Sequence, residues 1–505
     1  MTATARLHPD RLTELPAGVA RPAYDRAALQ TGIVHLGIGA FMRAHLAAAT
    51  EAALAAGDLR WGICGVSLRQ PDTRDALAPQ DGLYTLAIRD ADAQGAPRQR
   101  LQVMGAVREL LVAPENPTAV LERLAAPTTR IASLTVTEKG YCHDPASGAL
   151  RLEHPDIAHD LAHPAAPRSA IGYLVRGLAL RRSRGHGPLA LMSLDNLPAN
   201  GRVLRGAVLR LAEAADPGLA EWIAQHCSFP CSMVDRIVPR TTDADRAAIG
   251  DALGLQDAWP VLGEPFFDWA VEDHFAAGRP DWTLGGARFV AEAEPWEKLK
   301  LRMVNGTHSS IAYLGAMAGW QTVDVAIAQA PLRRHIEALM RDEIAPTLPA
   351  LPGLDLAGYG EQLLTRYANP ALAHRTHQIA MDGSQKLPQR LLGTVRDRLR
   401  AGAPITRLAM GVAGWLHYLR GVDEQGLAYA VEDPLAGPLT ELQRTALAGG
   451  ATPQAVHQLL SFAPVFGDLA GNEQLAAAVA PALASLREQG VLATLQQSLA
   501  APTRA

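Results

Sequence analysis

The sequence predicts an α/β protein in which a mostly parallel sheet domain is followed by a mainly α-helical C-terminal domain. The chain has 505 residues, more than one hydrophobic core usually organises, so two domains are expected. Short apolar runs alternate with helical stretches in the first part of the chain, which favours a parallel sheet. After residue 290 the chain is rich in Ala and Leu with few β-branched runs, which is typical of helices. We therefore expect domains at 1–290 and 291–505.

The first repeating unit contains a strand, a glycine-rich turn and a helix in that order. The apolar run 33–38 leads into a Gly-x-Gly turn and then into the Ala-rich segment 44–56. Glycines let the backbone approach a pyrophosphate, and the N-terminus of the helix faces its negative charge. The third glycine of the usual pattern is absent, so an ordinary tight turn is the alternative. We predict a Rossmann-type dinucleotide-binding domain, with cofactor contacts at Gly37, Gly39, Phe41 and Arg43.

The second predicted strand, 61–66, ends at Ser67-Leu68-Arg69. An NAD site often carries an acidic residue at this point for the ribose hydroxyls, whereas an arginine can meet the 2′-phosphate of NADP. Ser67 and Arg69 are therefore cofactor candidates, with a solvated Arg69 as the alternative. The missing acid leaves NADP open beside NAD.

Four further strands are predicted, at 83–88, 130–136, 189–194 and 233–238. Ligands bind at the carboxyl edge of open α/β sheets, and polar residues follow three of these strands. The residues in question are Thr135, Thr137, Glu138 and Lys139 after one strand, Asp195 and Asn196 after another, and Asp235 and Arg236 near a third. A cap or turn is the alternative for each. Segment 264–282 is expected to be a helix, and 291–296 the crossing between domains.

The nine residues from Lys300 to His308 carry the clearest chemical signal. If the run is helical, each residue turns by about 100°, which places Asn305 and His308 at roughly 140° and 80° from Lys300. Glu297 lies one turn earlier, near 60°. An amine, an imidazole, a carboxamide and a carboxylate then share one side of one helix. A surface helix with solvated charges is the alternative.

Such a set suits hydride transfer at a carbinol carbon. That reaction needs a base for the hydroxyl proton and donors for the developing alkoxide. Lys300 can be the base if burial or a positive neighbour lowers its pKa toward neutrality. Asn305 and His308 can bind the oxygen, and Glu297 can pass the proton on to water.

Composition and charge argue against other classes of protein. A net charge of −4 gives no electrostatic reason to expect nucleic acid or acidic membranes as partners. The first residues lack the apolar core of a signal peptide, and no uncharged run is long enough to span a bilayer, so we expect a cytoplasmic protein. Cys227 and Cys231 lie beside His226 but lack a second pair. We therefore expect buried thiols and no metal site.

Blocks along nearly the whole chain resemble the mannitol dehydrogenase family, the polyol-specific long-chain dehydrogenases. They comprise Val-His-Leu-Gly-Ile-Gly-Ala-Phe-Met-Arg-Ala-His at 34–45, Ser-Leu-Thr-Val-Thr-Glu-Lys-Gly-Tyr at 133–141, Asp195-Asn196, Met-Val-Asp-Arg-Ile-Val-Pro at 233–239, and Lys300-x4-Asn305-x2-His308. Segments 75–86, 137–142 and 381–390 are similar to the uronate-type branch of the family. At 381–390 this chain has Met-Asp-Gly-Ser-Gln-Lys-Leu-Pro-Gln-Arg, where mannitol-type members resemble Asp-Gly-Ser-Asn-Arg-Gln-Pro-Lys.

The resemblance implies a Rossmann-type domain, a helical domain, and metal-independent hydride transfer with NAD(H). It implies that Lys300 is the general base in oxidation and the acid in reduction, with Asn305 and His308 at the reacting oxygen. It further implies that Glu138 and Glu297 connect Lys300 to solvent, that Asn196 and Asp235 line the substrate or nicotinamide pocket, and that Lys386 meets the substrate. The uronate-type relatives also lack acids at the end of the second strand, which favours NAD.

A uronate carries a carboxylate, which an apolar pocket would leave unpaired. Lys386, Arg390 and Arg375 lie in one polar segment and can pair with it, although Arg375 and Arg390 can equally be surface charges. The first hypothesis is therefore interconversion of D-mannonate and D-fructuronate. A dehydrogenase of mannitol or arabinitol is the second, and a nicotinamide-binding protein without catalysis the third. The expected partner is a sugar acid or polyol, and the expected state a monomer or small homo-oligomer.

Overall fold

The structure, a computed structural model, describes residues 5–92, 96–144 and 148–500. It divides into two compact units. The N-terminal unit contains residues 1–90 and 98–294, and the C-terminal unit contains residues 91–97 and 295–505. The expected division at 290/291 lies close to the junction at 294/295. No helix in the described ranges is both long enough and apolar enough to cross a bilayer.

The N-terminal unit is built on a parallel five-stranded sheet in the order β5-β2-β1-β6-β7. The strands are β1 (Thr31–Leu36), β2 (Gly62–Ser67), β5 (Val107–Val112), β6 (Ile131–Leu134) and β7 (Ala190–Ser193). The chain leaves β1 toward β2 and β5 on one side and returns to β6 and β7 on the other. The order therefore reverses between β1 and β6, and open α/β sheets bind ligands at such a point. Four strands predicted from apolar runs are confirmed within two residues of their bounds, but the predicted strands at 83–88 and 233–238 belong to other sheets.

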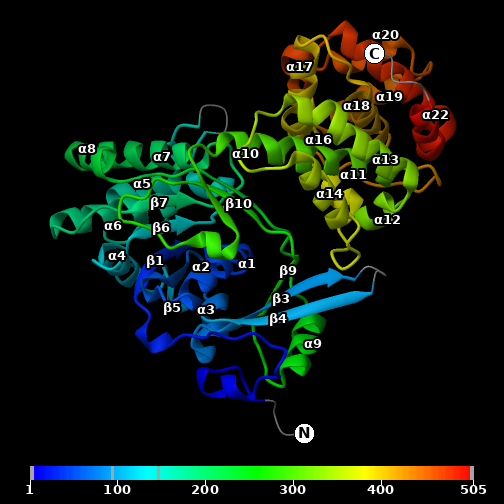
Figure 1. The fold of residues 1–505 in the computed structure, drawn as a ribbon. Helices are drawn as coiled ribbons and strands as arrows, with labels where there is room; N and C mark the ends of the chain where they lie inside the picture. Colours follow the sequence, from blue (N-terminus) through cyan, green and yellow to red (C-terminus); the bar gives the residue numbers. More distant parts are fainter. Residues whose placement is uncertain (1–4, 93–95, 145–147, 501–505) are drawn as a thin grey trace. The chain divides into compact units, whose positions relative to one another are not determined.

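Alternate residues of these strands enter two separate cores, one on each face of the sheet. Val34 and Leu36 pack with one cluster, whereas Ile33 packs with the other. The first face is covered by α4 (Pro117–Ala125), α6 (Ala170–Ser183), α7 (Asn200–Ala215) and α8 (Pro217–His226); the second by α1 (Ala40–Ala44) and α2 (Leu46–Ala55) (Figure 1). The remaining helices of the unit are α3 (Asp72–Leu77), α5 (Pro155–Ala162) and α9 (Asp243–Leu253). Successive side chains of a strand point to opposite faces of the sheet, and both faces of this sheet are buried, so each strand contributes to both cores.

Two smaller sheets complete the unit. One has the order β11-β10-β8 and the other β4-β3-β9. Their strands are β3 (Tyr84–Ala91), β4 (Pro97–Met104), β8 (Ser232–Asp235), β9 (Val261–Gly263), β10 (Asp268–Glu272) and β11 (Ala287–Val290). The helix expected at 264–282 is wrong, because this segment contains β10, which pairs antiparallel with β8 and parallel with β11. Trp269 and Val271 of β10 are fully buried, so long-range packing decided the structure of this segment.

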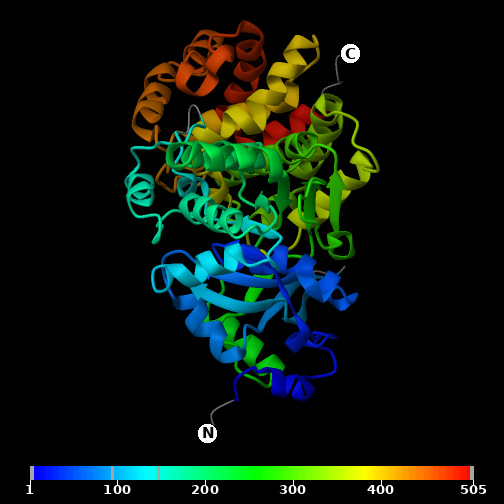
Figure 2. The same cartoon turned by 90° about the vertical axis from the view of Figure 1, so that its left-hand side faces the viewer.

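The C-terminal unit is helical, as predicted (Figures 1 and 2). Its first helices are α10 (Glu294–Leu299), α11 (Thr307–Met317), α12 (Val323–Ile327), α13 (Ala330–Ala338), α14 (Leu356–Tyr367), α15 (Thr376–Ala380) and α16 (Gly383–Leu387). They are followed by α17 (Gly393–Arg400), α18 (Thr406–Tyr418), α19 (Ala436–Ala446), α20 (Pro453–Leu460), α21 (Ala463–Phe466) and α22 (Glu473–Ala500). Every residue of α11 is buried, and α11 packs on α18, which packs on α22. A helix that is buried on all sides is a central core helix.

Candidate active site

The glycine turn after β1 has a backbone that only glycine adopts without strain. Gly37 has φ +96°, and a Cβ at this position would meet the Thr135 carbonyl oxygen at 2.2 Å. The Gly37 N–H donates to the Val66 carbonyl at 2.9 Å, which fixes the turn against β2. Gly39 is exposed, and a Cβ there would meet only the Gly37 oxygen, at 3.9 Å. The first turn of α1 has no side-chain cap. An open, uncapped helix start of this kind fits a dinucleotide pyrophosphate.

A buried hydrogen-bond network that sequence reasoning missed supports this turn. His35 Nδ1 lies 2.8 Å from Ser133 Oγ, and its Nε2 lies 2.9 Å from Thr135 Oγ1. The Thr135 hydroxyl in turn donates to the Gly37 carbonyl at 2.8 Å. Burial lowers the pKa of His35 to about 3, so the ring is neutral. The network therefore joins β1 and β6 to the turn through a neutral imidazole.

Phe41 and Arg43, the other two candidates at this helix start, make different contacts. Phe41 stacks on His45 with ring centroids 4.9 Å apart. The Arg43 side chain is buried, donates to the Trp259 carbonyl at 2.5 Å and lies over the Tyr84 ring. Burial lowers the pKa of Arg43 to about 10. The guanidinium is thus bonded within the protein core, and a contact between Arg43 and the cofactor stays a prediction.

The end of β2 carries the two remaining cofactor candidates. Ser67 is buried, and its carbonyl accepts from Ala113 N at 2.8 Å. Arg69 is exposed. It lies close enough to Cys142 for its charge to act on the pKa of that thiol, which burial raises to about 11. Ser67 and Arg69 thus lie at the expected edge of the sheet, and their contacts to a cofactor stay a prediction.

A carboxylate clamps the loop that carries Glu138. Asp195 is buried and accepts from Val136 N at 3.1 Å, Thr137 N at 2.9 Å and the Tyr141 hydroxyl at 2.9 Å. Burial raises the pKa of Asp195, and these donors oppose the rise. Thr137 has φ +62° and ψ 167°, a region that is essentially reserved for glycine. The clamp therefore holds a strained residue directly before Glu138, which is exposed at the start of a short 3₁₀ turn (Glu138–Tyr141).

The remaining candidates of this unit follow two other strands. Asn196 is exposed after β7, and Asp235 is half-buried at the end of β8. Both follow carboxyl ends of strands, as expected. Their assignment to a substrate or nicotinamide pocket is a prediction.

In the C-terminal unit, the run predicted to be a regular helix is helical but contains a π-helical segment, η7 (Lys300–Gly306). Its hydrogen bonds widen the turn, so the angles calculated for an α-helix do not apply, although α10, η7 and α11 are continuous. Lys300 and His308 are 9% and 8% exposed, whereas Asn305 and Glu297 are half-buried. The solvated surface helix is therefore wrong, because both the amine and the imidazole are buried. Such π-helical segments occur frequently at functional sites.

Aromatic and imidazole rings surround His308. Its ring lies 4.5 Å from the Tyr367 ring and 5.8 Å from the His374 ring, measured between centroids. The Tyr367 hydroxyl lies 2.8 Å from Thr307 Oγ1 and also donates to the Val304 carbonyl. Neither Tyr367 nor His374 was predicted from the sequence, because each lies about 60 residues or more after His308 and only the fold brings them together.

Three cationic side chains gather near the same imidazoles. Arg390 donates to Ser309 Oγ at 3.2 Å, next to His308. Lys386 and Arg366 lie close enough to His374 to lower its pKa, although burial is the larger cause. Burial and the charge of Arg390 likewise lower the pKa of Lys386. This cationic cluster, defined as Arg366, Lys386 and Arg390, therefore faces the segment that contains His308. Arg375 is exposed, which agrees with the alternative that its side chain is a surface charge.

The segment with Lys386 is held from a distant loop. Ser384 donates to Asp433 through its N–H at 2.7 Å and through its hydroxyl at 2.5 Å, and the Asp382 N–H donates to the Glu432 carbonyl at 2.9 Å. Asp382 itself has φ +55°. A Cβ on Gly383 would meet Trp415 Nε1 at 2.3 Å, so only glycine fits there.

A metal site needs several His, Cys, Asp or Glu side chains close together. In the described ranges, one group has suitable spacing: Cys142, His154 and Asp156. Cys227 and Cys231 are free thiols, half-buried and buried respectively. Burial raises the pKa of both, which agrees with the expected structural role.

Comparison with known proteins assigns both units. Residues 31–284 match the mannitol dehydrogenase Rossmann domain, and residues 292–487 match the mannitol dehydrogenase C-terminal domain. The chain is 47% identical over 479 residues to the D-mannonate oxidoreductase of Escherichia coli K12, covering 94% of this chain and 96% of the relative. It is 39% identical to the mannitol 2-dehydrogenase of Phaeosphaeria nodorum, covering 98% of this chain and 86% of that protein.

A solved structure agrees over the full length. The Pseudomonas fluorescens mannitol 2-dehydrogenase in ternary complex with NAD and D-mannitol superimposes with a TM-score of 0.81 at 37% identity, covering 98% of this chain and 100% of the other. The Rossmann-type fold, the helical second domain and the predicted resemblance are thus confirmed. The chain belongs to the mannitol dehydrogenase family and is an oxidoreductase acting on CH–OH groups.

Proposed function

We propose that this oxidoreductase interconverts D-mannonate and D-fructuronate with NAD(H). The observation that carries the proposal is the cationic cluster beside His308, in which Lys386, Arg390 and Arg366 lie near two imidazoles. A sugar acid brings a carboxylate that offsets this positive charge, whereas a neutral polyol does not. The 47% identity to a D-mannonate oxidoreductase supports the same choice.

NAD is the proposed coenzyme. The turn at Gly37 and Gly39 and the uncapped start of α1 would hold its pyrophosphate. The solved complex of the Pseudomonas fluorescens mannitol 2-dehydrogenase contains NAD, which supports the assignment. Neither Ser67 nor Arg69 carries a carboxylate that would repel the 2′-phosphate of NADP. The preference for NAD over NADP therefore stays a prediction.

The proposed mechanism uses residues of the continuous segment formed by α10, η7 and the start of α11. When bound, NADH would supply the hydride that the carbonyl carbon of the ketone accepts. Lys300 Nζ donates a proton to the carbonyl oxygen as the C=O bond becomes a C–O–H group, and Asn305 and His308 donate hydrogen bonds to that oxygen. Glu297 returns the proton from water to Lys300. In the oxidation direction Lys300 removes the hydroxyl proton.

A polyol such as mannitol is the second candidate substrate, and one observation favours it. The Lys386 amine donates to the Ile379 carbonyl at 3.4 Å and lies 3.9 Å from the Asp382 carboxylate. Part of its charge is therefore compensated by the protein itself, so a neutral ligand would not leave it isolated.

Substrate comparison separates the two candidates. NADH oxidation is followed at 340 nm with D-fructuronate, D-tagaturonate and D-fructose as acceptors, and NADPH is tested in parallel. We expect kcat/KM to be highest for D-fructuronate with NADH. Preference for D-fructose would move the chain to the polyol branch of the family. Binding of NADH without turnover of any acceptor would instead leave another sugar acid or a non-catalytic role.

A further inference from the structure

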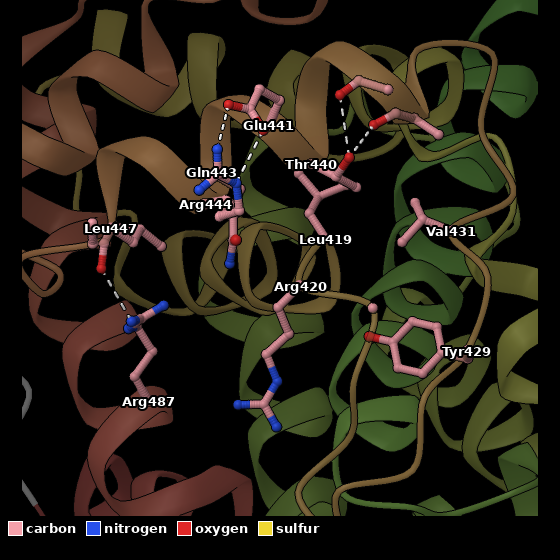
Figure 3. A pocket seen from close by; sticks show the side chains of 14 residues that line it. Leu419, Arg420, Tyr429, Val431, Thr440, Glu441, Gln443, Arg444, Leu447 and Arg487 are labelled. Atoms are coloured by element: carbon pink, nitrogen blue, oxygen red, sulfur yellow. Dashed lines mark hydrogen bonds and ion pairs between the residues drawn. The ribbon is translucent and has the colours of Figure 1, made fainter.

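A pocket in the C-terminal unit lies outside the residues considered so far. It has a volume of about 680 Å³ and lies between the end of α18, the segment 429–431, α19 and α22 (Figure 3). Its lining includes Arg420, Tyr429, Gln443, Arg444 and Arg487. None of these residues belongs to the candidate active site.

The pocket carries an excess of positive charge. Arg420 donates to the backbone carbonyls of Val422 and Asp423, and Arg487 donates to the Leu447 carbonyl at 3.2 Å. Within the described residues, neither guanidinium has a carboxylate within 4.0 Å. Partial burial and the charge of Arg420 lower the pKa of Arg487. Two like charges thus face one space without an acidic partner.

The nearby carboxylates are already engaged. Glu441 pairs with Arg444 at 2.6 Å in the upper part of the view (Figure 3). Glu424 accepts from Val491 N at 2.7 Å, and Asp423 Oδ1 accepts from the N–H groups of Gln425 and Leu427. The lining therefore contains three guanidinium groups and one carboxylate, and that carboxylate serves Arg444.

A neutral donor is buried in the wall of the same space. Gln443 is 4% exposed, and its Nε2 has no hydrogen-bond partner among the described residues. A buried amide N–H without a partner costs free energy that a ligand acceptor can recover. His417, behind the pocket, is fully buried, and burial with the charges of Arg420 and Arg487 lowers its pKa to about 3. It is neutral and adds no charge.

We propose that this pocket binds a small anion bearing a phosphate or carboxylate group, held by Arg420 and Arg487 with Gln443 Nε2 as a neutral donor. Guanidinium groups match the planar oxygen pairs of both groups, and a charge-assisted bond is about twice as strong as a neutral one. The site is separate from the proposed substrate site.

The pocket borders a segment of the chain that also holds the helix with Lys386. Tyr429 and Val431 line the pocket, and the next two residues, Glu432 and Asp433, hold Asp382 and Ser384. A ligand that orders segment 429–433 therefore also orders the helix that carries Lys386. This consequence rests on the proposed function, whereas binding of the anion does not.

Calorimetric titration tests the site on the full chain. Inorganic phosphate and citrate are titrated separately in the presence of saturating NADH, so that the pyrophosphate turn is filled. We expect binding of at least one probe, weakened about tenfold by Arg487→Gln and also weakened by Gln443→Leu, which removes the donor without changing charge. Arg334→Gln is the control, because Arg334 is an exposed arginine that donates only to the Ala330 carbonyl.

Three outcomes overturn the proposal: no binding of either probe at millimolar concentration, wild-type affinity in Arg487→Gln, or an equal loss in Arg334→Gln. The variant Lys386→Met is titrated in the same way to test whether the anion binds at the proposed substrate site instead. A loss in that variant without a loss in Arg487→Gln also overturns the proposal. The stronger of the two probes identifies the recognised group. Because the titration measures heat and not turnover, it stands if the proposed substrate is wrong.

Discussion

Replacement of Lys386 by methionine addresses the proposed substrate most directly. Methionine keeps an unbranched side chain of similar length and removes the charge. In the structure the Lys386 side chain is 26% exposed, and its two protein partners lie at 3.4 and 3.9 Å, both long for strong hydrogen bonds. The amine therefore has bonding capacity to give to a ligand.

The expected fall in kcat/KM follows from the hydrogen bond that the carboxylate of the substrate would lose. A hydrogen bond to a charged group contributes about 1.5–3 kcal/mol, and the partial exposure of Lys386 with Arg390 nearby favours the lower half of this range. About 1.5–2 kcal/mol corresponds to a fall in kcat/KM of roughly 10- to 30-fold. For D-fructose, which lacks the carboxylate, we expect a change within about twofold.

The assay is NADH oxidation with D-fructuronate and D-fructose for the wild type, Lys386→Met and a control, Lys298→Met. Lys298 lies in the same unit, is 37% exposed and pairs with Asp397 at 3.3 Å, so its loss tests the effect of removing any lysine. Equal losses for both substrates would mean that Lys386 acts on catalysis or folding and not on a carboxylate. Unchanged D-fructuronate kinetics would refute the reasoning outright.

Three further predictions follow from the same geometry. Lys300→Ala should lower kcat by about 10²- to 10⁴-fold, because general acid–base catalysis contributes that much, while NADH affinity measured by fluorescence stays unchanged; undiminished turnover would contradict its role. Burial and the charge of Arg390 lower the pKa of Lys386 from its ordinary value of 10.5. The amine is therefore charged at low pH and, as the pH rises, loses its charge before the pH reaches 10.5. The ratio of kcat/KM for D-fructuronate to kcat/KM for D-fructose should therefore fall as the pH increases from 7 to 10, and should stay constant in Lys386→Met. Thr137→Gly should raise the free energy of unfolding by about 1 kcal/mol in urea denaturation, because strain of about 1–3 kcal/mol is relieved against a loss of about 0.5–1 kcal/mol in backbone entropy; a less stable variant would show that Thr137 is not strained.

The sequence predicted four of the five strands of the central sheet because their signal is local, and it missed β5, whose middle residues are only half-buried. Parallel strands buried on both faces read as short apolar runs, and β1, β2, β6 and β7 all do so. Segment 264–282 carries no such signal. Its acids and aromatics favoured a helix, but the pairing of β10 with β8, more than 30 residues earlier in the chain, decided its structure.

The candidate catalytic run was identified from residue types and its role stays a prediction, whereas its local geometry was not predictable. The π-helical segment η7 packs against a second one, η10 (Pro388–Leu392), and a Cβ on Gly306 would meet the Arg390 carbonyl oxygen at 2.7 Å. Contact with a segment more than 80 residues away thus accompanies the wider turn. His35 was missed for a similar reason, because its partners Ser133 and Thr135 lie about 100 residues further on. The bond from Arg43 to the Trp259 carbonyl, more than 200 residues further on, could likewise not be foreseen.

The two units place their candidate residues by the same physical means. In each, a residue with positive φ that is not glycine, Thr137 or Asp382, comes shortly before a candidate side chain, Glu138 or Lys386. In each, a carboxylate from a distant segment accepts backbone N–H groups at that point: Asp195 from Thr137 and Asp433 from Ser384. Backbone strain of this kind persists only where the surroundings compensate for it. A carboxylate accepts and does not donate, so an isosteric amide would turn one acceptor into a donor facing an N–H. The positions of Glu138 and Lys386 therefore depend on carboxylates from distant segments of the chain, which explains why residue types near the site alone could not predict its geometry.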